Sequence, residues 1–520
     1  AKRMAEHDTG MDYSCVPDNT PILVGAGQFT EPMTESPALS PPLELAGRAA
    51  ARALLDAGGR LTAADLQAIA AIRLFSDSAP AWACPFGRSD NPPESIARRI
   101  GAAPARRIYS NAGGTQPMQL LAELCTDIAR GELNCALLAG GEAIASQRHA
   151  QRNGLELDWH EHHDQPLDSR EYSERFAAPA ELASGMYLPV HYYALIENLR
   201  AQQQGNDPDK HRLQMARLFA PFSEVAGDNP NAFWPRARSV EELYQQSAGN
   251  YPISLPYSKL LVAQDAVNQA AAVVIASAGL ARERGIDPHR WIFLQGYAEG
   301  EDQYVSQRED PGRSQAMEHV FESTLSSAGS GIENMALLDI YSCFPCAVEA
   351  ACDALDLPRD GSRVLTVTGG LPYFGGPGNN YSLHAVAEMV GRLRGTGARG
   401  LVTANGGILS KHAAAVFADR PDGALLDLAQ AGPHVIETAA IPARPLDADP
   451  SGGKVLTYTV IFERKRPDLA VILGESAAGE RFLARCADPG AVDACKAQSP
   501  IGRLVSLERL DDQLHFSFAN

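Results

Sequence analysis

The sequence predicts an α/β protein of two similar halves, interrupted by an insertion and followed by a small β-barrel. Strand-like and helix-like segments alternate over 20–144 and again over 281–420, which is typical of largely parallel sheets with helices on their faces. Each half contains a strand that ends in paired glycines, Gly140-Gly141 and Gly406-Gly407, so an internal duplication is a reasonable inference. From Gly453 onward the pattern contains only short strands separated by turn residues, with no helical segments between them.

The first half is assigned to 20–144 and 253–280. Its predicted elements, in chain order, are a strand at 21–27, a helix at 42–57, a strand at 71–75, a helix at 117–130, a strand at 134–139 and an apolar stretch at 253–276. Gly58-Gly59 ends the first helix, and Pro117 suits the first turn of the second, where its missing N–H is not needed.

An insertion is predicted at 145–252, because charged, His, Gln and Pro residues replace the alternating pattern there. Helical pieces are expected near 192–204 and 208–220. The run Trp159-His-Glu-His-His-Asp164 resembles a metal site by composition, but its histidines lack the i, i+4 spacing of a helical zinc site. We therefore predict a polar surface loop and no metal.

The second half is assigned to 281–420, a linker to 421–452 and the barrel to 453–520. The predicted elements of the second half are a strand at Leu337–Tyr341, a helix that opens at Pro345, a strand at Val364–Val367, a Gly-rich loop at 369–378, a helix at 381–394 and a strand at Gly400–Ala404.

Composition excludes several classes of protein. The 520 residues carry a formal net charge of −18, which argues against a nucleic-acid-binding surface. No apolar run is long enough for a membrane span, and the first ten residues show no secretory h-region. Nine scattered cysteines do not form a disulfide framework, so a reducing cytoplasm is expected.

Two segments open helices and carry candidate chemistry. The turn Gly113-Gly114-Thr115 presents backbone N–H groups that can bind an oxyanion or phosphate, unless it is only a tight turn. Cys343-Phe344-Pro345-Cys346 opens a helix that starts at Pro345, and the dipole of this helix would lower the pKa of Cys343 and make it a nucleophile or acid. A redox pair and inert buried thiols are the alternatives.

Two histidines are candidate general bases. His384 follows the Gly-rich loop, and His412 follows the turn at Asn405-Gly406. A single histidine is more often a hydrogen-bonded structural residue, so that reading stays open for both. The glycines of the loop, Gly376 among them, allow the backbone to approach a ligand closely.

Together these segments resemble the thiolase superfamily, and within it the sterol-carrier-protein-type thiolase-like proteins related to acetyl-CoA acetyltransferases. The resemblance covers roughly 20–415 and rests on five segments: PILVGAG, SNAGGTQP with LLAGGE, QDAVNQAAAVV, DIYSCF and TGGLPYFGGPGNN. It implies a duplicated fold of two βαβαβαββ-type halves with a loop-domain insertion. It also implies an acyl-CoA substrate, no cofactor and a homodimer, although the additional domain leaves the oligomeric state open.

The match of the active-site motifs is partial. The family's nucleophilic cysteine falls on Gly114, and the histidine of its Gly-His-Pro motif falls on Gly376. The histidine of the His-Asp-Cys-Phe motif falls on Tyr341, whereas the cysteine of that motif is retained as Cys343. A thiol proton shuttle without its acyl-accepting partner cannot run the usual ping-pong thiolysis.

The C-terminal stretch at 453–519 resembles the OB-fold domain of small acyl-CoA-binding subunits, through GKVLTYTVIF, GERFLAR and SPIGRLVSL. Some thiolase-fold partners of such subunits are retro-aldolases in which a tyrosine replaces the histidine of His-Asp-Cys-Phe, and Tyr341 fits that pattern.

The leading prediction is a thiolase-like acyltransferase or carbon–carbon bond enzyme acting on acyl-CoA. Cys343 would be its nucleophile or acid/base and Tyr341 the polar neighbour of Cys343, with His384 and His412 as further catalytic candidates. The residues expected to bind CoA or substrate are Gly113, Gly114, Thr115, Gly376, Asn405 and Gly406. The alternatives are a catalytically silent acyl-CoA-binding protein and a retro-aldolase of the same fold.

Overall fold

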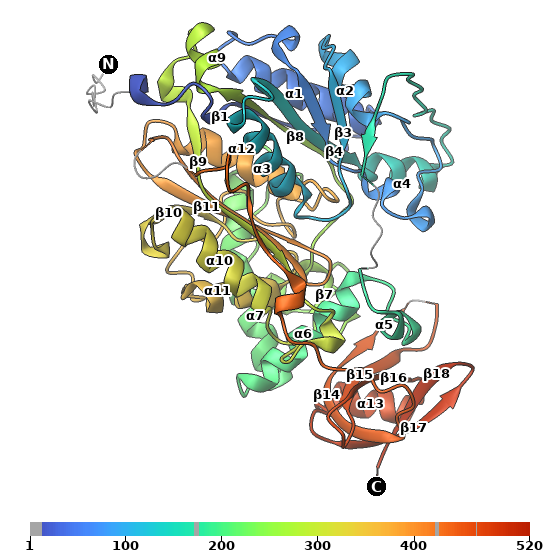
Figure 1. The fold of residues 1–520 in the computed structure, drawn as a ribbon. Helices are drawn as coiled ribbons and strands as arrows, with labels where there is room; N and C mark the ends of the chain where they lie inside the picture. The colour runs from blue at the N-terminus through green and yellow to red at the C-terminus, as the bar shows by residue number, and fades with distance from the viewer. Residues whose placement is uncertain (1–12, 171–175, 422–425, 464, 520) are drawn as a thin grey trace.

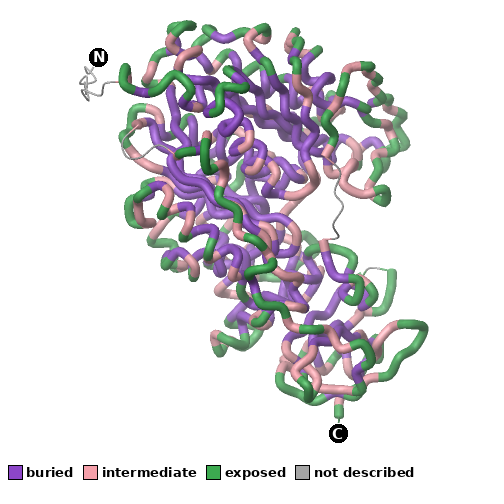
Figure 2. Tube along the Cα trace, in the orientation of Figure 1, coloured by how far each residue is buried: buried purple, intermediate pink, exposed green. Residues whose placement is uncertain are grey.

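The structure is a computed structural model that describes residues 13–170, 176–421, 426–463 and 465–519. Figure 1 shows the first half at the top in blue, the second half below it in yellow and orange, and the barrel in red at the far end. The central strands of both halves are buried along almost their whole length (Figure 2). Residues 171–175 of the predicted insertion and 422–425 of the predicted linker lie outside the described residues.

The first half is a six-stranded sheet in the order β1-β8-β4-β2-β3-β5. Its strands are β1 (Pro21–Thr30), β2 (Ala68–Ala71), β3 (Arg106–Tyr109), β4 (Cys135–Ala143), β5 (Asp168–Ser169) and β8 (Asn268–Ser277). Strands β4, β2, β3 and β5 are parallel, whereas β8 runs antiparallel to both β1 and β4. Helices α1 (Pro42–Asp56), α2 (Pro92–Ile100) and α3 (Gln116–Ala129) pack on this sheet.

The second half repeats this arrangement in the order β10-β11-β12-β9, with β13 paired to β9. Its strands are β9 (Ile292–Glu301), β10 (Met335–Asp339), β11 (Arg399–Gly406), β12 (Lys411–Ala418) and β13 (His434–Ile436). Its helices are α10 (Gln315–Ser327), α11 (Pro345–Leu355) and α12 (Tyr381–Leu393). Ile22 and Leu23 of β1 pair with β9, so one eleven-stranded sheet runs through both halves. The predicted α/β duplication is confirmed.

The predicted strand at Val364–Val367 is wrong. The segment is irregular, and Val364 is 62% exposed. The Asp339 carboxylate at the end of β10 accepts hydrogen bonds from the amides of Val367 and Thr368 at 3.0 and 3.1 Å. These backbone groups therefore bind a buried side chain instead of a neighbouring strand. The predicted strand at 71–75 is displaced, since β2 ends at Ala71.

The insertion folds mainly as helices, and the two short strands at its end pair with each other, the first of them also with a strand of the C-terminal region. These elements are α4 (Ile144–Asn153), α5 (Pro179–Ala183), α6 (Pro189–Gln203), α7 (Pro208–Asp228), α8 (Val240–Tyr244), β6 (Pro252–Ser254) and β7 (Tyr257–Ser258). The run at 159–164 folds back onto the loop at 86–91 and the first turn of α2. Trp159 packs edge-on against Phe86 with ring centroids 5.7 Å apart, and His163 Nε2 lies 2.8 Å from Ser95 Oγ.

A buried ionic cluster joins the insertion to α11. Glu197 of α6, His211 of α7 and Glu349 of α11 place one ligand-type atom each within 4.8 Å of one another. Their polar atoms already have protein partners: His211 Nε2 lies 2.6 Å from Glu197 Oε1, and Arg200 and Gln214 donate to the Glu349 carboxylate. These hydrogen bonds form a buried joint between the insertion and α11.

The C-terminal region is a closed five-stranded β-barrel in the cyclic order β14-β15-β16-β18-β17. Its elements are β14 (Gly452–Ile461), β15 (Leu469–Glu475), β16 (Arg481–Cys486), α13 (Pro489–Ala497), β17 (Leu504–Leu510) and β18 (Gln513–Phe518). Buried hydrogen bonds attach the barrel to α6: Thr457 Oγ1 donates to the Leu195 carbonyl (2.6 Å), and Asn198 Nδ2 donates to the Tyr458 carbonyl (2.7 Å). No helix among the described residues is long and apolar enough to cross a membrane.

Candidate active site

The turn before α3 is held in place by the second half of the protein. The Gly113 amide donates to Asn379 Oδ1 at 3.0 Å, and Ser382 Oγ donates to the Gly114 carbonyl at 3.0 Å. Asn379 Nδ2 in turn donates to the Arg73 carbonyl at 2.8 Å. The Gly-rich loop therefore clamps the turn, and Asn379 and Ser382 are site residues that the sequence analysis missed, although both lie in or just after the TGGLPYFGGPGNN motif.

The space beside Gly114 is filled. A Cβ atom at this position would lie 2.2 Å from the Asn405 carbonyl oxygen and 2.5 Å from the Tyr341 hydroxyl, far inside van der Waals contact. A nucleophilic side chain cannot be accommodated at Gly114 in this arrangement. The tyrosine that falls at the position of the motif's histidine thus occupies the volume in which a cysteine side chain would begin.

Tyr341 follows β10 and is almost completely buried. Its amide donates to Thr403 Oγ1 of β11 at 2.9 Å, and its ring meets that of Tyr381 edge-on at 5.4 Å. Among the described residues its hydroxyl has no hydrogen-bond partner. Burial and the neighbouring Cys343 raise the pKa of this hydroxyl, so it stays protonated at neutral pH and is able to donate a hydrogen bond.

Cys343 lies next to Tyr341, as predicted, but its thiol is not activated. Burial raises the pKa of Cys343 to about 12, although contact with the Tyr193 hydroxyl and the backbone amides near α11 acts in the opposite direction. The expectation that the helix dipole favours a thiolate is therefore wrong, because loss of solvation outweighs the dipole. Cys346 is buried too, with the Tyr257 hydroxyl donating to its Sγ at 3.3 Å.

This burial predicts the order in which the cysteines react. With iodoacetamide at pH 8, Cys15, which is exposed, and Cys84, which is partly exposed, should be alkylated first, and Cys343 should remain unmodified until the protein unfolds. Peptide mass mapping over a time course measures this order. Labelling of Cys343 as fast as that of Cys15 would contradict the burial argument.

The two candidate histidines are both buried and hydrogen-bonded. His384 Nδ1 lies 2.7 Å from Gln28 Oε1 of β1, and burial lowers the pKa of His384 to about 3. His412 Nδ1 lies 3.0 Å from Asn405 Oδ1, and its Nε2 lies 2.8 Å from Ser314 Oγ. Burial lowers the pKa of His412 to about 4. Neither ring is a base of usable strength near pH 7.

The structure brings most of the predicted binding residues together. Asn405 reaches Gly114 through its carbonyl, and a Cβ at Gly406 would lie 3.4 Å from the Gly114 amide nitrogen and 3.5 Å from Thr115 Oγ1. The Thr115 hydroxyl is buried and has no hydrogen-bond partner among the described residues. The Gly376 amide donates to the Gln264 carbonyl at 2.8 Å, and the amide of the preceding Ala263 donates to the Cys343 carbonyl at 3.0 Å.

Comparison with known proteins identifies the family to which this chain belongs. Residues 435–512 match the model of the thiolase-like protein type 1 additional C-terminal domain. The chain is 33% identical to a monomeric SCP2-thiolase-like protein type 1 from Mycobacterium smegmatis, of known crystal structure, with a TM-score of 0.80 over 97% of this chain and 100% of that one. The chain belongs to the SCP2-thiolase-like proteins. No curated protein sequence is close enough to count as a match.

More distant structures share the fold of this SCP2-thiolase-like protein. An acetyl-CoA acetyltransferase from Syntrophomonas wolfei is 16% identical, with a TM-score of 0.55 over 77% of this chain and 98% of that one. The Ltp2-ChsH2 aldolase is 17% identical, with a TM-score of 0.57 over 78% of this chain and 99% of that one. The recognition of a thiolase-superfamily protein with an additional C-terminal domain is thus confirmed.

Proposed function

We propose that this protein binds an acyl-CoA thioester at the turn 113–115 and does not form an acyl-enzyme. The observation that carries the proposal is the Tyr341 hydroxyl, 2.5 Å from where a side chain at Gly114 would start. The position of the family's acyl-accepting thiol is occupied by a neutral phenol. The neighbouring thiol of Cys343 is a weak nucleophile because its pKa is raised to about 12.

The same groups are suited to hold a thioester carbonyl. The Tyr341 hydroxyl and the buried Thr115 hydroxyl have no hydrogen-bond partner among the described residues, and both face the start of α3. A protonated phenol donates to a carbonyl oxygen, and the N-terminus of α3 favours the partial negative charge on that oxygen. The site would thus bind and polarise a thioester without transferring its acyl group.

The barrel supplies a second part of this proposal. Its cyclic strand order and the helix between its third and fourth strands support an OB-like fold, a class of barrel whose exposed face and loops commonly bind ligands. We propose that it contacts the CoA portion of the ligand. The buried hydrogen bonds from Thr457 and Asn198 hold it against α6.

A retro-aldolase is the second candidate, and two observations favour it. Tyr341 stands where the His-Asp-Cys-Phe histidine is expected, and an aldolase shares the fold. Retro-aldol cleavage needs a base that removes a hydroxyl proton, however, and burial weakens both nearby histidines as bases. Thioester binding therefore has the stronger support.

Tyr341→Phe tests the proposal. Loss of one hydrogen bond to the thioester carbonyl should weaken acetyl-CoA binding by about fivefold to fifteenfold, from about 1–1.5 kcal/mol. Binding of free CoA, which has no acyl carbonyl, should not change. Calorimetry with both ligands measures the two affinities, and Tyr187→Phe, at an exposed tyrosine, is the matched control. Equal losses for both ligands would show that Tyr341 does not contact the carbonyl.

A further inference from the structure

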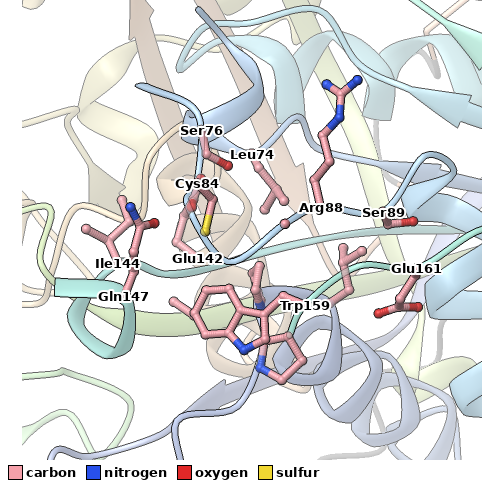
Figure 3. Close-up of a pocket in the computed structure, with 15 residues that line it drawn as sticks. Leu74, Ser76, Cys84, Arg88, Ser89, Glu142, Ile144, Gln147, Trp159 and Glu161 are labelled. Atoms are coloured by element: carbon pink, nitrogen blue, oxygen red, sulfur yellow. The ribbon is translucent and has the colours of Figure 1, made fainter. Parts of the chain in front are cut away.

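A hollow lies in the first half of the protein, between the start of α1, the loop after β2 and the end of β4 (Figure 3). The hollow is shallow: its free space is about 410 Å³ when the open solvent at its mouth is counted, and the part that can hold the centre of a water-sized group is about 20 Å³. Leu43, Leu74, Ile144 and Trp159 form apolar walls, and Ser76, Cys84 and Glu142 supply polar groups. The lining contains none of the residues around Tyr341 and Gly114.

Glu142 is the unusual group of this hollow. It is only 4% exposed, yet it lines the hollow, at the end of β4. Its Oε1 accepts a hydrogen bond from the Phe75 amide at 2.6 Å. The same atom would lie only 2.3 Å from a Cβ atom added at Gly378. Its Oε2 has no partner among the described residues. One oxygen is thus fixed by the protein, and the other is left for a ligand.

The neighbouring acidic groups differ from Glu142 because each of them has a cation. Arg99 binds Glu161 through two hydrogen bonds of 2.7 and 2.9 Å. Arg148 binds Asp265 in the same way at 2.7 and 2.8 Å. Arg88 lies 3.7 Å from Asp77. In the described part of the chain no cationic side chain pairs with Glu142, which is therefore a buried carboxyl that lacks the counter-charge of its neighbours.

We propose that this hollow binds a small organic ammonium, with the cation paired to the Glu142 carboxylate and its alkyl part against Trp159, Leu74 and Ile144. An ammonium group supplies both the missing donor and the missing charge. The net charge of −18 also raises the local concentration of cations around the protein.

The ionisation state of Glu142 predicts how amine binding should depend on pH. Burial, and next the charges of Asp77 and Asp265, raise the pKa of Glu142 to about 8, although the Phe75 amide acts against this shift. Without a ligand the carboxyl is mostly protonated at pH 7, and it must lose its proton to bind a cation. Binding should therefore release close to one proton per bound amine at pH 7, and affinity should rise by on the order of tenfold or more from pH 6 to pH 9.

The test is a calorimetric titration of the full-length protein with n-butylammonium chloride, with n-butanol as the uncharged probe. At pH 9 the amine should bind at least about tenfold more tightly than the alcohol, and Glu142→Gln should remove this preference. Glu161→Gln is the matched control, because Glu161 lines the same hollow but is already paired with Arg99, and it should change amine affinity by less than about twofold.

Proton release is measured on the unmodified protein at pH 7, in two buffers of different ionisation enthalpy, so the test does not depend on the variants folding. Equal affinity for amine and alcohol, amine binding without proton release, or equal losses in Glu142→Gln and Glu161→Gln would each overturn the proposal.

Discussion

Replacing Gly114 with alanine is expected to destabilise the protein by about 2–3 kcal/mol, because the added methyl group has no space. Its nearest neighbours are the Asn405 carbonyl oxygen at 2.2 Å and the Tyr341 hydroxyl at 2.5 Å. One of them is backbone, so the strain cannot be relieved by a side-chain rotation alone. Chemical denaturation of parent and variant gives the difference in the free energy of unfolding.

Gly391→Ala is the matched control. Gly391 lies in α12 with nothing within 4 Å of an added Cβ, so alanine should leave stability unchanged or raise it by about 0.5–1 kcal/mol. A double-mutant cycle with Tyr341→Phe isolates the contact with the hydroxyl: Gly114→Ala should cost less in the Tyr341→Phe background. An alanine at 114 that costs nothing would show that Tyr341 does not occupy this space.

His211→Ala is expected to cost about 3–5 kcal/mol, because it leaves the carboxylate of Glu197 buried without its cation. Arg313→Ala, which breaks an ion pair with Glu318 on the surface, should cost no more than about 1 kcal/mol. Denaturation midpoints of both variants measure the contrast. Equal effects would mean that the buried cluster does not stabilise the joint between the insertion and α11.

The same pair predicts a pH dependence. Burial alone would lower the pKa of His211, but the hydrogen bond and charge of Glu197 raise it above 6.5, so its contribution is complete below about pH 6.5 and is lost as pH rises through the raised value. Burial alone would raise the pKa of Glu197, but His211 lowers it, so its contribution is lost as pH falls below its ordinary value near 4.5. The stability difference between parent and His211→Ala should therefore be largest between about pH 4.5 and 6.5.

The order of elements could be predicted from the sequence wherever local signals agree. PILVGAG marks β1 correctly, and the prolines at 117 and 345 mark the starts of α3 and α11. Strand β12, KHAAAVFA, was missed because alanine has little preference for strands, and it pairs on both sides inside the sheet. Val364–Val367 has the residue types of a strand, but the Val367 amide donates its hydrogen bond to the Asp339 carboxylate and not to a neighbouring strand. Such competition between distant groups cannot be read from a local pattern.

The sequence identifies several residues of the site, but it does not predict their contacts or their pKa values. The sequence places Tyr341 and Cys343 together and puts Gly114 at the position of the nucleophile. It could not show that the tyrosine ring reaches the start of α3, since the two residues are far apart in the chain. The pKa of Cys343 was predicted in the wrong direction because helix position is visible in a sequence and burial is not. The lowered pKa values of His384 and His412 could not be predicted either, because the burial of their rings is not visible in the sequence.

The most direct test of the account is the mass of the intact protein after incubation with acetyl-CoA, at concentrations where calorimetry shows saturable binding. The account predicts binding, no acetyl adduct on any cysteine, and no thiolysis of acetoacetyl-CoA at rates typical of enzymes, roughly 1–1000 per second. An acetyl group mapped to Cys343, and lost in Cys343→Ala, would contradict it, because the thiol would then be a nucleophile despite its burial.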